Sequence, residues 1–142
     1  MIGELCSKPA VTASPDTTAR EAAHRMWTRK VGALVVVNRR GVPIGVVTDR
    51  DIAVKVVAQG ADPASVRVGS LLARRPVVIR EDAGVLDATK LLSRRGVRRL
   101  PVVSRTGKLV GIISLDDLLM LIGSELSHIA STLASELGRT RV

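Results

Sequence analysis

The chain contains the same sequence pattern twice, and this internal repeat is the feature that most limits what it can fold into. Residues 34–52 read LVVVNRRGVPIGVVTDRDI, and residues 100–118, displaced by 66 positions, read LPVVSRTGKLVGIISLDDL. Both segments carry glycines, a hydroxyl residue and an aspartate at matching positions, and their apolar positions interchange Val, Ile and Leu. The segments before them, PAVTASPDTTAREAAHRM and PVVIREDAGVLDATKLL, also follow one pattern. The chain is therefore a tandem duplication.

Each copy is predicted to form a strand, a helix, two further strands and a second helix. Thr18 and Glu21 have the spacing of a capping box, followed by apolar residues at helical intervals. Val- and Ile-rich runs joined by the short loops NRRG and SRTG indicate hairpins. The expected strands are 11–13, 31–37 and 42–48 in the first copy and 77–79, 97–103 and 108–114 in the second.

The expected fold is of the mixed α/β (α+β) class, with the two copies packed about a pseudo-two-fold axis. A unit of about 55 residues would leave a whole sheet face exposed, whereas two units can cover each other. We expect the first repeat at 5–62, the second at 63–123, and an amphipathic helix with a basic tail at 124–142.

The composition limits the kind of core, the cellular compartment and the disulfide bonds that the protein can have. Among 142 residues there is no Phe or Tyr and only one Trp, so the core must be aliphatic. No uninterrupted apolar run approaches the roughly 18 residues that span a bilayer, and the start MIGELCSKPA lacks the regions of a signal peptide. We therefore expect a cytoplasmic protein without membrane contact. Cys6 is the only cysteine, which excludes an internal disulfide.

A formal net charge of +9 favours anionic partners such as nucleotides or nucleic acid. Direct nucleic-acid binding is the less favoured alternative, because the sequence lacks aromatic stacking residues and a groove-reading helix motif. No nucleophile–base constellation, no His/Cys metal spacing and no Walker-type loop is present, so we predict neither an enzyme nor a metal site.

Each repeat ends with a hydroxyl residue and, three positions later, a carboxylate in the first turn of a helix. The pairs are Thr48 with Asp51 and Ser114 with Asp117. Free amide groups at a helix N-terminus favour phosphate, and a nearby carboxylate can accept hydrogen bonds from a vicinal diol such as ribose. The same residues would also serve simply as helix caps, and the local pattern leaves both interpretations open.

The strings GVVTDRDI and GIISLDDL, each after a hairpin of the LVVVNRRG or LPVVSRTG type, resemble a pair of cystathionine β-synthase (CBS) domains, known as a Bateman module. The likeness covers roughly residues 5–123, and without an accompanying catalytic domain the chain looks like a stand-alone member. The resemblance implies a regulatory sensor that binds an adenine nucleotide, with AMP or ATP favoured and NAD or S-adenosylmethionine as alternatives. No other cofactor is required.

In the family, the aspartate holds ribose hydroxyls and the hydroxyl residue lies near phosphate, in pockets between the repeats. The resemblance places Ser114 and Asp117 in the preferred site, completed by the following residues: Ser14, Ala19, Val31, Gly32 and Arg98. Successive strand residues face opposite ways, so only one of Arg98 and Arg99 can enter the pocket, and we favour Arg98. The mirror site comprises Thr48, Asp51, Arg80, Val85 and Val97. We expect it to be weaker, because the counterpart of Arg98 is Gly32.

Beyond the second repeat, Leu and Ile recur at three- and four-residue intervals from Leu118 to Leu137, which predicts an amphipathic helix. Its apolar face must be covered by the rest of the module or by a second subunit. Family members commonly pair, and we expect a homodimer to which this helix contributes. We also expect an effector protein, which the sequence does not identify. A purely structural dimer with vestigial pockets is the remaining alternative.

Overall fold

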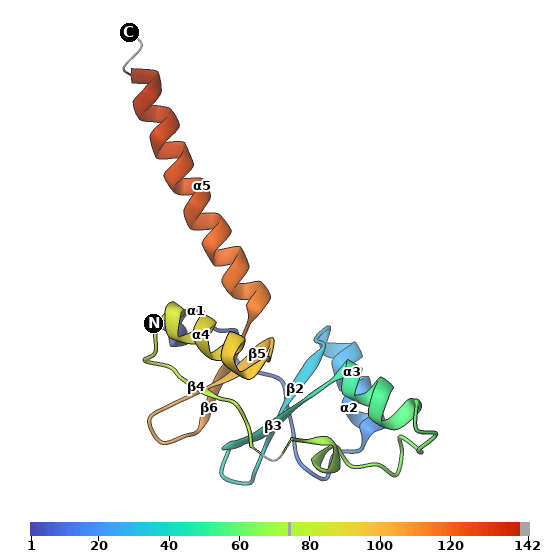
Figure 1. The fold of residues 1–142 in the computed structure, drawn as a ribbon. Coiled ribbons are helices and arrows are strands. Elements are labelled where there is room, and N and C mark those ends of the chain that lie inside the picture. The colour runs from blue at the N-terminus through green and yellow to red at the C-terminus, as the bar shows by residue number, and fades with distance from the viewer. Residues whose placement is uncertain (74, 140–142) are drawn as a thin grey trace.

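The computed structural model describes residues 1–73 and 75–139, and it forms two three-stranded sheets lying side by side (Figure 1). After the short helix α1 (Ile2–Leu5), the first repeat contains β1 (Thr12–Ala13), α2 (Ala19–Arg29), β2 (Ala33–Val37), β3 (Pro43–Thr48), α3 (Asp49–Ile52) and a π-helical turn, Ala53–Val57. A 3₁₀ turn at Val68–Leu71 leads to β4 (Ile79–Arg80), α4 (Val85–Arg95), β5 (Arg99–Val103), β6 (Leu109–Ser114) and α5 (Leu115–Arg139). The expected α/β class and the tandem repeat are confirmed.

The two sheets have the same topology and the same register. In each, the first strand runs parallel to the second, and the second pairs antiparallel with the third. Ala33 pairs with Thr48 and Arg99 with Ser114, which are equivalent positions 66 residues apart. A bulge follows Val36 in one sheet and Val102 in the other. The duplicated sequence therefore produces duplicated hairpins down to their irregularities.

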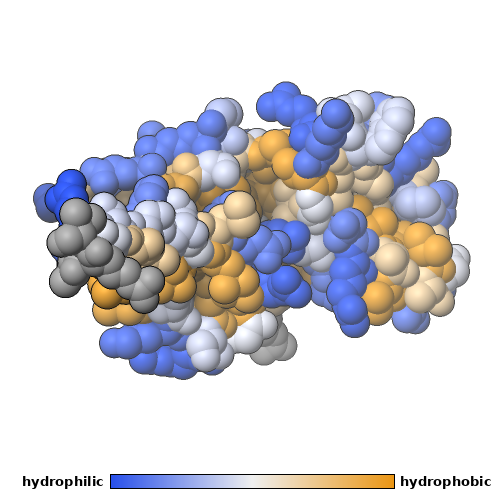
Figure 2. Space-filling view, turned by 90° about the horizontal axis from the view of Figure 1, so that it is seen from above, coloured by the Kyte–Doolittle hydropathy of each residue, from blue (hydrophilic) through white to orange (hydrophobic). Residues whose placement is uncertain are grey.

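α5 is a single continuous helix that projects from the body, as the red rod of Figure 1 shows. The predicted amphipathic helix is thus the extension of the helix that begins directly after β6. By length and composition alone α5 could cross a membrane, contrary to the sequence expectation, although one such helix is weak support for a membrane span. Figure 2, which views the whole molecule from above, shows hydrophobic side chains exposed among hydrophilic ones. The last part of the expected basic tail lies outside the described residues.

The two sheets have separate helix-covered cores and meet through their other faces. Leu34 and Val36 belong to the core of the first repeat, and Leu100 and Val102 to that of the second. Side chains alternate along a strand, so the residues between them point to the opposite face. Two such residues, Val35 and its equivalent Pro101, are fully buried yet belong to neither core. The alternation thus places them between the sheets.

The segment that precedes each repeat packs on the other repeat. Ile2 in α1 is fully buried in the second core, and its amide donates to the carbonyl of Ala83 at 2.9 Å. Its equivalent, Val68, is fully buried in the first core, and its amide donates to the carbonyl of Thr17 at 2.8 Å. This reciprocal exchange ties the halves together and crosses the expected boundary between 62 and 63.

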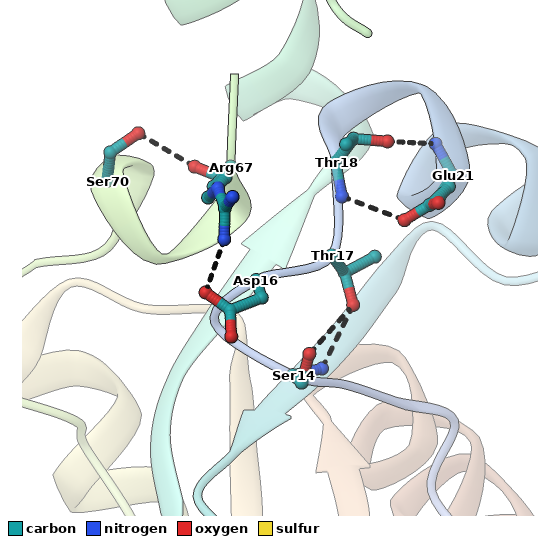
Figure 3. Close-up of polar contacts among 7 residues, drawn as sticks. All are labelled: Ser14, Asp16, Thr17, Thr18, Glu21, Arg67 and Ser70. Atoms are coloured by element: carbon teal, nitrogen blue, oxygen red, sulfur yellow. Dashed lines mark hydrogen bonds and ion pairs between the residues drawn. The ribbon is translucent and has the colours of Figure 1, made fainter. Parts of the chain in front are cut away.

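Polar contacts reinforce the exchange at the first repeat (Figure 3). Arg67, just before the 3₁₀ turn, reaches the carboxylate of Asp16 at 2.8 Å. In the same view, Thr18 and Glu21 form the predicted capping box: the Glu21 amide donates to Thr18 Oγ1 at 3.1 Å, and the Thr18 amide donates to Glu21 Oε2 at 3.0 Å. The start of α2 and the connecting segment are therefore held as one polar cluster.

The exchange generates a prediction at Gly111 in β6. A Cβ there would lie 2.5 Å from the carbonyl oxygen of Ser7, which accepts the amide of Ile112 at 3.1 Å and cannot retreat without losing that bond. We expect Gly111→Ala to lower the free energy of unfolding by about 1–3 kcal/mol in urea denaturation. Gly45→Ala is the repeat-matched control: its Cβ would meet only the flexible end of Leu72, so its effect should be smaller. Equal losses for both variants would contradict this account of the crossing segment.

Candidate functional site

The hydroxyl–carboxylate pairs at the ends of β3 and β6 form reciprocal helix caps. The amide of Asp51 donates to Thr48 Oγ1 at 3.1 Å, and the amide of Thr48 donates to Asp51 Oδ2 at 2.9 Å. In the second repeat, the amide of Asp117 donates to Ser114 Oγ at 3.1 Å, and the amide of Ser114 donates to Asp117 Oδ2 at 2.8 Å. The capping interpretation is therefore correct for both pairs, and it uses only one oxygen of each carboxylate.

The second carboxylate oxygen distinguishes the two pairs. Asp51 Oδ1 lies 3.2 Å from the ammonium group of Lys55, one turn further along the chain. The position equivalent to Lys55 is Leu121, which carries no charge. Within residues 1–73 and 75–139, Asp117 Oδ1 has no hydrogen-bond or ion-pair partner. Asp117 thus keeps an acceptor available to a ligand, whereas that of Asp51 is engaged.

A cavity of about 210 Å³ lies between the repeats beside Asp117. Its walls come from the N-terminal segment, from β2 and the residues before it, and from β5, β6 and α5. The lining residues are Ser7, Pro9, Ala10, Val11, Val31, Gly32, Ala33, Arg99, Ile112, Ser114 and Asp117. Four of the predicted site residues (Val31, Gly32, Ser114 and Asp117) are therefore brought together from opposite halves of the chain.

Arg99, and not Arg98, lines this cavity, which corrects the predicted orientation. Arg98 is 71% exposed and lies 3.5 Å from the carboxylate of Asp116 on the outer surface. The reason is that side chains alternate between the two faces of β5. Leu100 points into the core of its own repeat, and Arg98, two residues away, shares that face. Arg99 points with Pro101 toward the other sheet.

Gly32 leaves the space that Arg99 occupies. A Cβ at position 32 would lie 3.3 Å from Arg99 Nη2 and 3.4 Å from Asp49 Oδ2. Because Gly32 has no side chain, the guanidinium of Arg99 can lie close to the backbone of the first repeat. Arg99 has no ion-pair partner among the described residues, so its charge remains available to an anion. A forked guanidinium can bind two phosphate oxygens at once.

A second cavity, of about 130 Å³, is related to the first by the repeat. It is lined by Gly45, Val46, Ala73, Arg75, Pro76, Val77, Val97 and Arg99. Arg99 thus borders both cavities, and Arg75 adds a second guanidinium to the smaller one. The predicted residue Val97 lies there, but Thr48 and Asp51 do not line it.

The remaining predicted residues lie elsewhere. Ala19 is fully buried in the first core. Ser14 lines a separate surface hollow of about 540 Å³, and its amide donates to Thr17 Oγ1 (Figure 3). Arg80 is paired with Asp82, and Val85 packs against the second core. None of these four lines either cavity between the repeats.

The prediction missed the N-terminal wall of the larger cavity. Ser7, Pro9 and Ala10 precede the recognisable motif, and nothing in their types signals a site. The useful signal was positional: these residues are equivalent to Ala73, Arg75 and Pro76, which line the smaller cavity. Next to Ser7, burial raises the pKa of the Cys6 thiol, partly offset by the positive charge of Lys8. In residues 1–73 and 75–139, no group of three His, Cys, Asp or Glu could hold a metal ion.

Comparison with known proteins shows which family shares this arrangement. The family model described as "CBS domain" matches the chain twice, over residues 2–58 and 68–124. The CBS domain-containing protein YhcV of Bacillus subtilis is 40% identical over 117 residues, which are 82% of this chain and 81% of YhcV. An uncharacterized protein of Methanopyrus kandleri is 38% identical over 120 residues, or 84% of this chain. The chain spans only 61% of that relative, and 21% of a CBS domain-containing protein of Arabidopsis thaliana.

Solved structures share the fold. The CBS domain pair of protein MJ0100, in complex with 5′-methylthioadenosine and S-adenosyl-L-methionine, superposes with a TM-score of 0.79. Its sequence identity is 26%, over 88% of this chain and 97% of that chain. The CBS domain protein PAE2072 from Pyrobaculum aerophilum, complexed with AMP, has a TM-score of 0.75 and 27% identity, over 87% and 98% of the two chains.

The caps predict a stability effect that is separate from ligand binding. Ser114→Ala removes the acceptor for the Asp117 amide at the start of α5, and we expect the free energy of unfolding to fall by about 0.5–2 kcal/mol. Chemical denaturation without ligand measures this. Ser114→Thr is the matched control, because Thr48 makes the equivalent bond in the first repeat. A Ser114→Ala protein as stable as Ser114→Thr would show that the hydroxyl does not support the helix.

Proposed function

The chain belongs to the CBS-domain family, and from that premise we propose that it is a non-catalytic regulatory module that binds an adenine nucleotide between its two repeats. The observation that carries the proposal is the meeting of three ligand-binding features at one cavity. They are the free carboxylate oxygen of Asp117, the exposed start of α5, and the unpaired guanidinium of Arg99. The adenosine-containing ligands of the solved relatives support the same class of ligand.

Each group has a role that its chemistry suits. Asp117 Oδ1 accepts hydrogen bonds from ribose hydroxyls while Oδ2 continues to cap the helix. Arg99 and the positive end of the α5 dipole attract phosphate. Val11, Val31 and Ile112 provide apolar surface for the base. At about 210 Å³ the cavity is smaller than the roughly 300–1,000 Å³ typical of ligand pockets. A nucleotide therefore fills it and extends into its mouth.

The second site is the weaker one in this proposal, for a reason that differs from the sequence argument. Gly32 does not deprive it of a basic residue, because Arg99 and Arg75 border the smaller cavity. Its weakness lies in the carboxylate, since Asp51 is paired with Lys55 and neither Asp51 nor Thr48 lines the cavity. A single Arg99 side chain must also serve both sites, so occupancy of one site lowers the phosphate affinity of the other.

Binding acts on conformation because the ligand contacts both halves. Arg99 and Asp117 belong to the second repeat, and Val31 and Gly32 to the first. A ligand that prefers the packed arrangement shifts the equilibrium toward it by its difference in affinity for the two states. At 100 times its Kd, it adds about 2.7 kcal/mol to the free energy of unfolding. An effector protein that recognises one arrangement would then bind according to ligand level.

A homodimer is part of the proposal. Both repeats expose large apolar side chains on their helices. Trp27 is 77% exposed on α2, and Val54 after α3 and its equivalent Met120 on α5 are also exposed. Such residues on equivalent helices are suited to pack against a second copy. The adenine-nucleotide function is favoured over nucleic-acid binding. The observation that supports nucleic-acid binding is the net charge of +9.

Binding to the larger cavity is testable with two variants and one control. AMP, ATP, NAD and S-adenosylmethionine are each titrated by calorimetry into the full chain. For the tightest ligand that carries phosphate, we expect Asp117→Asn and Arg99→Ala each to raise the Kd about tenfold or more, as for lost charged hydrogen bonds. Arg98→Ala should leave the Kd within about twofold, because that side chain is exposed on the outer surface.

Asp117→Asn retains an oxygen that can accept the Ser114 amide, so its ligand-free melting temperature checks that the cap survives. Parental affinity in both Asp117→Asn and Arg99→Ala would place the ligand elsewhere. No binding of any of the four ligands, with strongly salt-dependent binding of duplex DNA, would favour the nucleic-acid alternative. No binding of either kind would support a structural dimer.

A further inference from the structure

The outer part of α5 exposes an apolar stripe that the rest of the chain does not cover. Leu118 is buried in the second core, which anchors the base of the helix. Beyond it, large aliphatic residues lie open to solvent with exposed fractions between 42% and 68%. They are Leu119, Ile122, Leu126, Ile129, Leu133 and Leu137. The helix projects from the body, so no described element lies against this stripe (Figure 1).

The spacing of the stripe identifies the geometry of its partner. From Leu119 to Leu133 the apolar residues are separated by three, four, three and four positions. This is the heptad of a coiled coil, with leucine at a and isoleucine at d. Ordinary packing against a globular surface requires a broader stripe with a period near 3.6 residues. The spacing therefore fits a partner helix that carries the same repeat.

The opposite face of α5 argues against a lipid partner, although the helix has the length of a membrane span. That face carries hydroxyl side chains along its length, at Ser124, Ser127, Ser131 and Ser135, and Glu125 lies near the middle of the helix, at the edge of the stripe. A helix spanning a bilayer would hold the Glu125 carboxylate near the hydrocarbon centre, which is costly for an ionisable group. A helix lying on an anionic membrane surface needs a basic polar face, but between 116 and 138 every charged residue is acidic.

A second copy of this chain carries the same heptad positions along the same length of helix. In a parallel pair, each g position faces the next e position of the partner. Along the exposed part of α5 these are Glu125 with Ala130 and Thr132 with Leu137, since Leu118, the first g residue, is buried in the second core. These g–e pairs bring no like charges together. The like pair of the parallel arrangement is Glu136 at the d position, near the end of the helix and beyond the Leu119–Leu133 seam. In an antiparallel pair centred on the stripe, Glu125 would face its own copy. The parallel arrangement is therefore compatible with self-association.

The order of the core residues also selects the number of helices. Leucine at a with isoleucine at d favours bundles of three or four parallel helices over two-stranded coils. The small e residues Gly123 and Ala130 leave room for a further helix beside the seam. We infer that α5 assembles with the α5 helices of other copies of this chain into a parallel bundle of more than two helices. This inference does not depend on nucleotide binding.

The test compares two doubly substituted full-length proteins with the parent by analytical ultracentrifugation. Leu126→Lys with Ile129→Lys places two charges in the stripe, and Ser124→Lys with Ser131→Lys places the same two charges on the polar face. We expect at least three chains per particle for the parent and the polar-face variant, and at most two for the stripe variant. All four positions are exposed, so circular dichroism should show a retained fold in both variants.

Other results would overturn the inference. A stripe variant with the mass of the parent would show that the stripe holds no second copy. A parental particle of two chains or one would exclude the multi-helix bundle. Co-flotation of the parent with phosphatidylcholine vesicles, lost in the stripe variant at unchanged mass, would identify a membrane as the partner instead.

Discussion

The reciprocal exchange of the segments before each repeat is the constraint on which the rest of the structure depends. Ile2 completes the core of the second repeat and Val68 that of the first, each fully buried and held by backbone hydrogen bonds. Neither repeat therefore has a complete core of its own. The residues that follow these two segments then run between the sheets and become walls of the two cavities. Folding and site formation share the same crossing segments.

The polar pairs that end β3 and β6 illustrate how a carboxylate can cap a helix with one oxygen and keep the other for a second contact. From the sequence, helix capping and ligand binding were alternative interpretations of these residues. The geometry shows that one carboxylate oxygen suffices for the cap. What separates the two pairs is a residue outside the motif, since Lys55 pairs with the second oxygen of Asp51 and Leu121 leaves that of Asp117 open. Equal motifs thus acquire unequal chemistry from their neighbours on the helix.

Much of the fold was predictable because each element of the repeat occurs in two sequences, 66 residues apart, that predict the same structure. The hairpins, their matched register and the capping box at Thr18 follow from local spacing, which tertiary packing here reinforces. The site was predictable in part. Val31, Gly32, Ser114 and Asp117 meet as expected. The orientation of Arg98 was wrong because it depends on which face of β5 enters the core, and the burial of Leu100 decides that. The positions of Ser7 and Pro9 beside the cavity depend on a chain crossing that no local pattern encodes.

The continuity of α5 has a mechanical consequence. Its first turn contains Asp117 at the edge of the cavity, and the same helix continues without interruption to Arg139. At 1.5 Å per residue, a helix of this length is a rod of about 37 Å, and a tilt of about 5° at its base moves its tip by about 3 Å. The helix is thus a lever whose short arm is its first turn, beside the cavity. A change too small to disturb the packing of the sheets becomes, at the far end, a displacement comparable to the radius of a side chain.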